Sequence, residues 1–504
     1  MSETRARTSP GRPLFTVAEV GRLTGAEVVG QREPAGTRAG DLVLTGVEVD
    51  SRLVRGGDLF CALPGERVDG HAFVGAAFDR GALAALVSRD PPTPVGPGRV
   101  LLRVPDVLTA LGRLARYHRD RYSLPVIGVT GSVGKTTTKD LVASALGATK
   151  RVLKNQGNLN TDIGLPLTVF ELGPEHEIAC LEMGMRGPGE ITRLALIARP
   201  DIGILTNIGP VHMELLGSLE AIAAAKEELL ESLPRNGSAV MNADDPLVAG
   251  MADRHRGRLG RVVTYGLDVP ADITATDIDG KDSAGVRFRG VLPQGSGLGE
   301  GDLGFFSVPL AGRHIVSNAL AAVATALLVG LGADDIRRGL MRPDLSAMRQ
   351  ETFTAGGVLV INDAYNAGPA SMAAAVKLLE DTRSRRGGRA VAVLGDMLEL
   401  GDLSEPAHRE LGRAVTAAGI DYLVTVGPRS RDTATEAVLF GFDSARVTHF
   451  DGERAVEDAA RAVLGLVREG DVVLVKASRG MKLERVAQRL ATALRDRGTG
   501  GDGP

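Results

Sequence analysis

The stretch that decides the fold of this chain reads VIGVTGSVGKTT and runs from Val126 to Thr137. Its first residues predict a buried strand, and the glycine-rich turn after them leads into a helix that begins near Lys135. Backbone N–H groups in such a turn, together with the helix N-terminus, form a cradle for phosphate oxygens. The pattern is the short form G-x-x-G-K-T, because the first glycine of the longer motif would fall at Val129. The preceding strand favours a phosphate loop over a chance Gly-Lys-Thr in a surface turn.

Two side chains of this loop have expected roles. Lys135 would reach the β- and γ-phosphates of a nucleotide, and the Thr136 hydroxyl would ligate Mg²⁺. The chain has only nine lysines among its 59 basic residues. Because arginine serves elsewhere as the generic positive charge, a lysine retained inside a motif is a candidate for chemistry that a guanidinium cannot perform. The sequence offers no guanine-reading motif, so ATP is expected rather than GTP.

The apolar pattern outside the loop predicts an α/β protein with several domains. Short apolar runs between Gly-rich turns predict a small α/β domain over residues 15–104, and helical spacing predicts a linking helix over 106–121. From residue 126 onward strands alternate with helices, as in a mostly parallel sheet built from βαβ units. The alternation starts afresh after about residue 342 and predicts a second doubly wound domain.

Individual elements follow from the same pattern. Residues 290–304 are expected to form a mobile surface loop, residues 318–331 an Ala-rich helix, and residues 496–504 a disordered tail. Strands are expected at 126–129, 178–181, 202–205, 239–241, 358–361, 391–394, 423–426 and 472–475.

Polar residues follow several of these strands. Glu182 follows one strand, Asn207 follows the next with His212 five residues beyond, and Asn242 follows a third. Ligands of open α/β sheets bind beyond the carboxyl ends of the strands, so these residues are expected to lie at the same edge as Thr136. Glu182 and His212 are plausible ligands of a second cation, although imidazole is a less usual ligand for Mg²⁺.

The composition excludes several classes of protein. A net charge of −3 gives no support for a nucleic-acid-coating protein or a polybasic membrane binder. Aromatic residues make up 3% and Trp is absent, which argues against a stacking platform for single-stranded nucleic acid. Cys61 and Cys180 lie in apolar runs and are expected to be buried thiols. No apolar stretch has the roughly 18 residues that a membrane span needs. The N-terminus also lacks the apolar core of a signal peptide. A cytoplasmic protein without stable membrane insertion is expected.

Taken together, these motifs resemble those of the ATP-dependent Mur ligases of peptidoglycan synthesis, and the resemblance covers about residues 45–490. The segments that carry it are TGSVGKT (130–136), NLNTDIGLPL (158–167), EMG (182–184), NIGPVH (207–212), GRHIVSN (312–318) and MR (348–349).

Further segments are similar to the members of this family that add a D-alanyl-D-alanine dipeptide. Segments like those of a UDP-sugar-binding first domain are DSR (50–52), GGDLF (56–60) and GERVDGH (65–71). Segments like those of the dipeptide-adding members are DAYNAGPASM (363–372), GDMLELG (395–401) and KASR (476–479). Gly368 stands where that signature usually has Asn, and the DNPR motif of the diaminopimelate-adding ligases is absent.

The resemblance implies an α/β fold of three domains. Residues 15–104 would bind UDP-MurNAc-peptide, and residues 105–341 would form the central P-loop ATPase domain with a mostly parallel sheet. Residues 342–495 would form a Rossmann-like doubly wound domain that binds the incoming dipeptide. Catalysis would need closure about a hinge near residues 340–348. A monomer is expected.

The implied reaction joins UDP-MurNAc-tripeptide to D-Ala-D-Ala through an acyl phosphate, with ATP and two Mg²⁺ ions as cofactors. By resemblance, the catalytic residues would be Lys135, Glu182, His212, Lys226 and Arg349. ATP would be bound by Gly131, Ser132, Val133, Gly134, Lys135, Thr136, Thr137, Asn242, Asn318, Arg349 and Asp363. The substrates would be bound by Ser51, Arg52, His71, Asn160, Thr161, Tyr365, Asn366, Ser371, Lys476 and Arg479. The metal ligands would be Thr136, Glu182, His212 and, if carbamylated, Lys226.

Some alternatives remain open at this point. Lys226 lies in a predicted helix and could simply face solvent, Asp363 could cap a helix that starts near Pro369, and Arg349 could pair with a surface acid. Another amino-acid-adding Mur-type ligase or a folylpolyglutamate synthetase-like enzyme is the second candidate function. A catalytically silent nucleotide-binding scaffold is the third.

Overall fold

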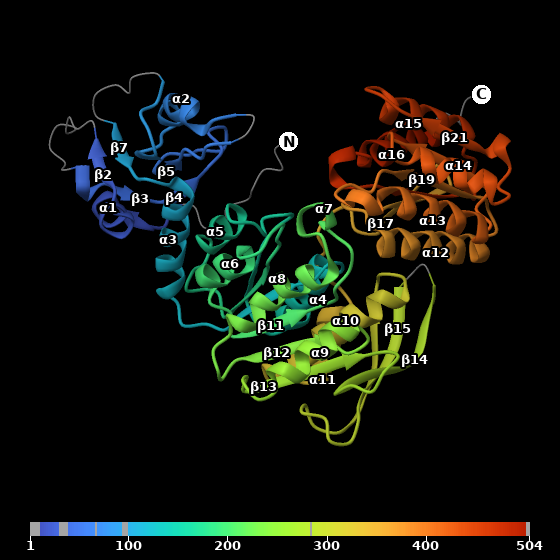
Figure 1. Ribbon diagram of the computed structural model, residues 1–504, viewed down its shortest axis with the longest axis horizontal. Helices are drawn as coiled ribbons and strands as arrows, with labels where there is room; N and C mark the ends of the chain where they lie inside the picture. The colour runs from blue at the N-terminus through green and yellow to red at the C-terminus, as the bar shows by residue number, and fades with distance from the viewer. Residues whose placement is uncertain (1–10, 30–38, 66–67, 93–98, 283–284, 500–504) are drawn as a thin grey trace.

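The computed structural model describes residues 11–29, 39–65, 68–92, 99–282 and 285–499 (Figure 1). Three large sheets occupy three successive stretches of the chain. The blue N-terminal domain and the orange C-terminal domain lie on either side of the green and yellow middle domain. Within the described residues, no helix combines the length and the apolar character needed to cross a membrane.

The N-terminal domain is built on a five-stranded sheet in the order β2-β7-β6-β5-β4. Only β2 is antiparallel to its neighbour, and the other pairs are parallel. Its strands are β2 (Glu27–Val29), β4 (Gly46–Glu48), β5 (Asp58–Cys61), β6 (Ala84–Val87) and β7 (Val100–Arg103), with helices α1 (Val17–Thr24) and α2 (Val74–Asp79). A small antiparallel pair joins β1 (Phe15–Thr16) to β3 (Val43–Leu44). The linking helix expected over 106–121 is α3 (Val107–Asp120), which Asp106 caps.

The middle domain contains a nine-stranded sheet in the order β16-β15-β14-β13-β12-β11-β8-β10-β9. The sheet is parallel from β9 to β14, and β15 and β16 extend it as antiparallel strands. The strand that precedes the phosphate loop is β8 (Val126–Thr130), which is fully buried and lies near the centre of the parallel part of the sheet. The other strands are β9 (Val152–Lys154), β10 (Ile178–Glu182), β11 (Ile202–Leu205), β12 (Ser238–Asn242), β13 (Arg261–Gly266), β14 (Ile273–Asp282), β15 (Gly285–Leu292) and β16 (Gly301–Val308).

Two expectations for this domain need correction. The loop expected over 290–304 is only 293–300, because both flanks belong to β15 and β16. Gly290 is glycine because it lies against the Phe306 ring, which an added Cβ would meet at 2.9 Å. The helix expected over 318–331 is α10 (Arg313–Leu328), so Asn318 lies in its second turn and not at its start. The other helices are α4 (Lys135–Gly147), α5 (Gly164–Val169), α6 (Glu190–Ala198), α7 (Met213–Leu216), α8 (Leu219–Glu231), α9 (Pro246–His255) and α11 (Ala333–Leu340).

The C-terminal domain has a six-stranded sheet in the order β17-β18-β22-β19-β20-β21, parallel except for the edge strand β17. Its strands are β17 (Glu351–Ala355), β18 (Val358–Asn362), β19 (Ala390–Gly395), β20 (Tyr422–Val426), β21 (Val447–Phe450) and β22 (Val472–Lys476). Its helices are α12 (Pro369–Arg386), α13 (Ser404–Ala417), α14 (Arg431–Leu439), α15 (Ala455–Leu466) and α16 (Glu484–Thr499). The tail expected from residue 496 is therefore wrong for 496–499, which continue a helix whose Leu490 and Leu494 are buried. Residues 500–504 lie outside the described residues.

Candidate active site

The phosphate loop connects β8 to α4 and depends on two glycines. Gly131 has φ +147°, and a Cβ there would lie 1.9 Å from the Thr206 hydroxyl oxygen. Gly134 has φ +84° and precedes the first turn of α4, where a Cβ would come within 2.9 Å of Asn318 Oδ1. The amide of Asn207 holds the loop from the next strand, since its Oδ1 accepts from the Val133 N–H at 2.8 Å. The loop backbone is thereby fixed with its N–H groups at the start of a helix, which is the geometry of an anion site.

Lys135 lies over the loop that precedes it. Its ammonium donates to the carbonyl oxygens of Gly131 and Ser132, at 2.8 and 3.0 Å. Burial lowers the pKa of Lys135, and Glu182 counteracts that shift while Arg349 adds to it. The ammonium is thus close to the loop N–H groups, where a phosphate would bind.

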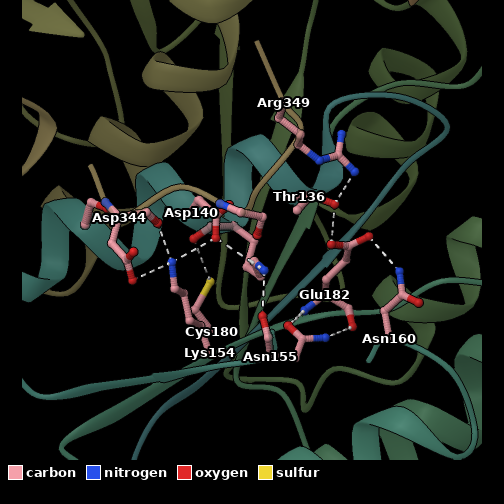
Figure 2. Close-up of polar contacts among 12 residues, drawn as sticks. Thr136, Asp140, Lys154, Asn155, Asn160, Cys180, Glu182, Asp344 and Arg349 are labelled. Carbon is pink, nitrogen blue, oxygen red and sulfur yellow. Dashed lines mark hydrogen bonds and ion pairs between the residues drawn. The ribbon is translucent and has the colours of Figure 1, made fainter. Parts of the chain in front are cut away.

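Thr136 is the meeting point of the two larger domains (Figure 2). Its hydroxyl donates to Glu182 Oε2 at 2.6 Å and accepts from Arg349 Nη2 at 2.7 Å. The other carboxylate oxygen of Glu182 accepts from Asn160 Nδ2 at 2.7 Å. Arg349 also lies 4.2 Å above the ring of Tyr365. Arg349 therefore reaches the phosphate loop and does not pair with a surface acid.

The structure brings some of the expected metal ligands together and leaves others apart. Glu182 contacts Thr136, but His212 pairs through Nδ1 with Glu399 Oε2 at 2.6 Å. Nowhere in the described ranges do three or more His, Cys, Asp or Glu side chains form a cluster that could hold a metal ion. Mg²⁺ commonly uses one or two protein oxygens together with substrate phosphates, so the Thr136 hydroxyl and the Glu182 carboxylate fit that ion.

Lys226 is buried rather than facing solvent. It lies on α8 and its side chain is 1% exposed. Within the described part of the chain its ammonium has no hydrogen-bond or ion-pair partner. Burial lowers the pKa of Lys226 well below its ordinary value, and the positive charge of Lys135 lowers it further. Burial and the charge of Lys135 therefore both favour the neutral form of this amine near the phosphate loop.

A cavity of about 400 Å³ lies between the phosphate loop and the C-terminal domain. Asp363 and Lys476 line it and pair at 2.5 Å, so Asp363 does not cap α12. Expected ATP-binding residues that line it are Ser132, Val133, Gly134, Lys135, Thr136, Thr137, Asn318, Arg349 and Asp363. Expected substrate-binding residues that line it are Tyr365, Asn366, Ser371 and Lys476.

Other expected ligand-binding residues lie outside this cavity. Asn242 is at the same sheet edge, where its amide donates to the Thr206 carbonyl oxygen. Thr161 follows Asn160 and accepts from the Gly164 N–H, and Arg479 pairs with Glu484. These side chains are occupied by protein partners in this arrangement of the domains.

Three expected residues belong to the N-terminal domain. Arg52 pairs with Asp50 at the surface, and Ser51 between them is 9% exposed. His71 is buried, with Nδ1 2.7 Å from Asp69 and Nε2 accepting from the Ser88 N–H. In this structure His71 fixes the loop after β5, and its role toward substrate stays a prediction.

Several residues around the site could not be found from the motifs. Asn155 bonds both the N–H and the carbonyl oxygen of Glu182, and Lys154 pairs with the buried Asp140. Lys154 is the last residue of β9 and Asn155 follows it, and the pattern did not reveal this short strand. For Lys154, the scarcity of lysine was the one available signal. Glu399 lies in the GDMLELG segment, but nothing in its spacing indicates His212 as the partner.

Three family models together match most of the chain. They are described as Mur ligase family, catalytic domain (residues 43–119), Mur ligase middle domain (129–326) and Mur ligase, glutamate ligase domain (348–479). The UDP-N-acetylmuramoyl-tripeptide–D-alanyl-D-alanine ligase of Bacillus subtilis is 40% identical over 89% of this chain and 93% of its own length.

Solved structures agree with these matches. MurF from Acinetobacter baumannii superposes with a TM-score of 0.82 at 31% identity, covering 96% of this chain and all of the other. MurF ligase from Thermotoga maritima in complex with ADP gives a TM-score of 0.74 at 29% identity, covering 90% of this chain and 98% of the other. This chain belongs to the Mur ligase family.

Proposed function

We propose that this protein is the ATP-dependent ligase that adds D-alanyl-D-alanine to UDP-MurNAc-tripeptide, giving UDP-MurNAc-pentapeptide, ADP and phosphate for peptidoglycan synthesis. The observation that carries the proposal is the meeting of Thr136, Glu182 and Arg349 at the edge of a cavity lined by both the phosphate loop and the C-terminal domain. The 40% identity to a relative of that name supports the choice of substrates.

The site must bring a carboxylate against the γ-phosphate of ATP, although both are negatively charged. Lys135 and Arg349 supply fixed positive charge where negative charge develops in the transition state. Thr136 and Glu182 would hold Mg²⁺, which neutralises phosphate charge when it is bound. The tripeptide carboxylate attacks the γ-phosphorus and ADP leaves, which gives an acyl phosphate. The neutral dipeptide amine then attacks the acyl carbon, loses a proton and expels phosphate.

The three domains divide the substrates among them in this proposal. Residues 15–104 bind UDP-MurNAc-peptide, residues 105–341 bind ATP, and residues 342–495 bind the dipeptide. Tyr365, Asn366, Ser371 and Lys476 support the last assignment because they face the nucleotide loop across the cavity. One chain supplies every residue of that cavity, so a monomer suffices. Because the proposed reaction consumes ATP, we propose that the enzyme is cytoplasmic.

Lys226 has a separate proposed role. A buried amine whose pKa is lowered can react with CO₂ in its neutral form, giving a carbamate and a proton. The carbamate would supply an anionic oxygen for a second Mg²⁺ beside the phosphate loop. A protonated lysine could not do so, and neither could an arginine.

The decisive experiment is mass spectrometry of the product formed from UDP-MurNAc-tripeptide, D-Ala-D-Ala and Mg-ATP. The expected product is heavier than UDP-MurNAc-tripeptide by two alanyl residues, and the release of phosphate should depend on D-Ala-D-Ala. Phosphate release that depends on a free amino acid instead would favour another amino-acid-adding ligase of the family. No release with any acceptor would favour a nucleotide-binding scaffold.

A further inference from the structure

The segment between the middle and C-terminal domains is held on the phosphate-loop helix by a buried charge cluster (Figure 2). The side chain of Asp140, on α4, is 1% exposed. Its Oδ1 lies 3.0 Å from Lys154 Nζ and 3.3 Å from Lys139 Nζ, and its Oδ2 accepts from the Ser346 N–H at 2.8 Å. Burial alone would raise the pKa of Asp140, but the two lysines outweigh that effect and keep the carboxylate charged.

Additional contacts hold the same segment upstream of Ser346. Lys154 Nζ donates to the Asp344 carbonyl oxygen and lies 3.1 Å from its carboxylate. Ser144, one turn after Asp140, accepts from the Asp344 N–H at 3.0 Å. Gly339 of α11 packs directly on α4, since a Cβ there would lie 2.2 Å from the Ser144 carbonyl oxygen. The chain from α11 through Ser346 is therefore attached to α4 and would move together with the middle domain.

The backbone changes character immediately after this anchored segment. Met348 has φ +59° and Gln350 has φ +49°, and both are non-glycine residues in the left-handed region. Such positions are strained and are common where a chain switches conformation. Arg349, whose guanidinium contacts Thr136, lies between them. Rotation of the C-terminal domain at this point would move Arg349 relative to the phosphate loop.

Hydrogen bonds also connect this charge cluster to Glu182, whose carboxylate contacts Thr136. Lys139 Nζ donates to the Asn155 carbonyl oxygen at 2.6 Å. The amide of Asn155 accepts from the Glu182 N–H at 2.9 Å and donates to the Glu182 carbonyl oxygen at 3.0 Å. One buried polar network thus contacts both the interdomain segment and the strand end that carries Glu182.

We propose that Asp140 and Lys154 are positioning residues, which fix the interdomain segment up to Ser346 so that domain rotation is confined to residues 347–350 and delivers Arg349 to Thr136. This inference rests on the proposed function for its effect on turnover. The expected hinge near 340–348 is then narrower and lies further along the chain, because its first half is bound to α4.

The test measures the distance between the two domains by spin labelling of the full-length protein. Labels go on Arg235→Cys in the middle domain and Leu439→Cys in the C-terminal domain, since both positions are exposed. The native Cys61 and Cys180 are buried and do not compete for label. The variants are Lys154→Met, which removes the charge, and Ser144→Ala, which removes one anchor and keeps a good helix former in α4. The matched control is Lys150→Met, a lysine just after α4 that has no side-chain partner in the described structure.

Lys154→Met is expected to widen the distance distribution at least about twofold and to lower kcat about tenfold, while the Kd for Mg-ADP changes less than about twofold. Ser144→Ala is expected to show the same changes on a smaller scale, and Lys150→Met to match the parent protein.

Equal distance distributions and equal kcat in either folded variant and the parent would overturn the inference, even if thermal stability falls. If Lys154→Met does not fold, Ser144→Ala decides the matter by the same readouts. A parent protein without D-Ala-D-Ala-dependent ligation would contradict the proposed function, and the distance distributions would still test the anchor.

Discussion

Glu399 Oε2 lies 2.6 Å from His212 Nδ1, and the two residues come from different domains and are 187 positions apart. Both are non-glycine residues in the left-handed region, with φ +63° and +56°. Arg186 of the middle domain contacts the other carboxylate oxygen of Glu399 at 2.7 Å. One carboxylate of the C-terminal domain therefore contacts two side chains of the middle domain, and this contact exists only while the domains keep this arrangement.

The contact is expected to weaken in acid. The pKa of Glu399 is lowered from 4.5 to about 2, chiefly by the hydrogen bond with His212 and then by Arg186. Burial acts in the opposite direction. A lowered pKa in the folded state means that the stabilisation is complete above about pH 4.5 and is lost as the pH falls toward 2. Spin-label distances followed from pH 7 down to about pH 3 should show the domains separating progressively once the pH falls below about 4.5. Glu399→Gln should already show that separation at pH 7. Glu405→Gln, which removes one carboxylate of an exposed ion pair within a helix, should behave as the parent does.

Removal of the Lys135 ammonium should abolish most turnover. A preorganised donor to a developing negative charge is commonly worth about 10²–10³ in rate, so Lys135→Met should lower phosphate release by at least that factor. Lys150→Met removes a lysine that lies just beyond the C-terminal end of the same helix and should leave the rate unchanged. If Lys135→Met retained more than a tenth of the parent rate, the phosphate assignment would be contradicted.

A methyl group at Gly131 should disrupt the phosphate loop itself. Gly131→Ala would place Cβ 1.9 Å from the Thr206 hydroxyl oxygen in a conformation that L-residues rarely adopt. Backbone strain of this kind costs about 1–3 kcal/mol, so we expect Mg-ADP affinity to fall about tenfold to a hundredfold by calorimetry. Gly147→Ala, at the other end of α4, meets no atom within 4 Å and should bind nucleotide normally.

Chemical rescue tests the carbamate proposed on Lys226. Lys226→Ala leaves a small buried space beside the phosphate loop and should be inactive in the absence of added acids. Formate or acetate should restore part of the activity in a concentration-dependent way, because either can supply the anionic oxygen. Chloride at the same ionic strength is the control. A Lys226→Ala enzyme that is active without rescue would rule the carbamate out.

The architecture of the phosphate-loop domain followed from the sequence where strands are parallel and buried. The stretches 126–129, 178–181, 202–205 and 239–241 read as apolar runs because helices cover both faces of the sheet. The antiparallel extension was not visible in the same way. In β15, buried residues alternate with partly buried or exposed ones, and its glycines resemble those of a turn.

The candidate site was predictable to a similar extent. Thr136, Glu182 and Asn207 could be placed at one edge because the carboxyl ends of parallel strands meet there. The partners of His212 and Asp140 could not, since each contact joins segments whose separation in sequence carries no local pattern. The burial of Lys226 was equally hidden, because an Ala-rich helix gives no indication of which face is covered.

The cavity lined by both the phosphate loop and the C-terminal domain has a practical consequence. A compound that fills it would touch Asn318 and Asp363 at the same time, so it would bridge the two bodies that the proposed hinge turns against each other. Such a compound would hold the two domains in one relative arrangement and would thereby stop turnover. Its potency would then depend on how far apart the two halves stand, and not only on competition with ATP.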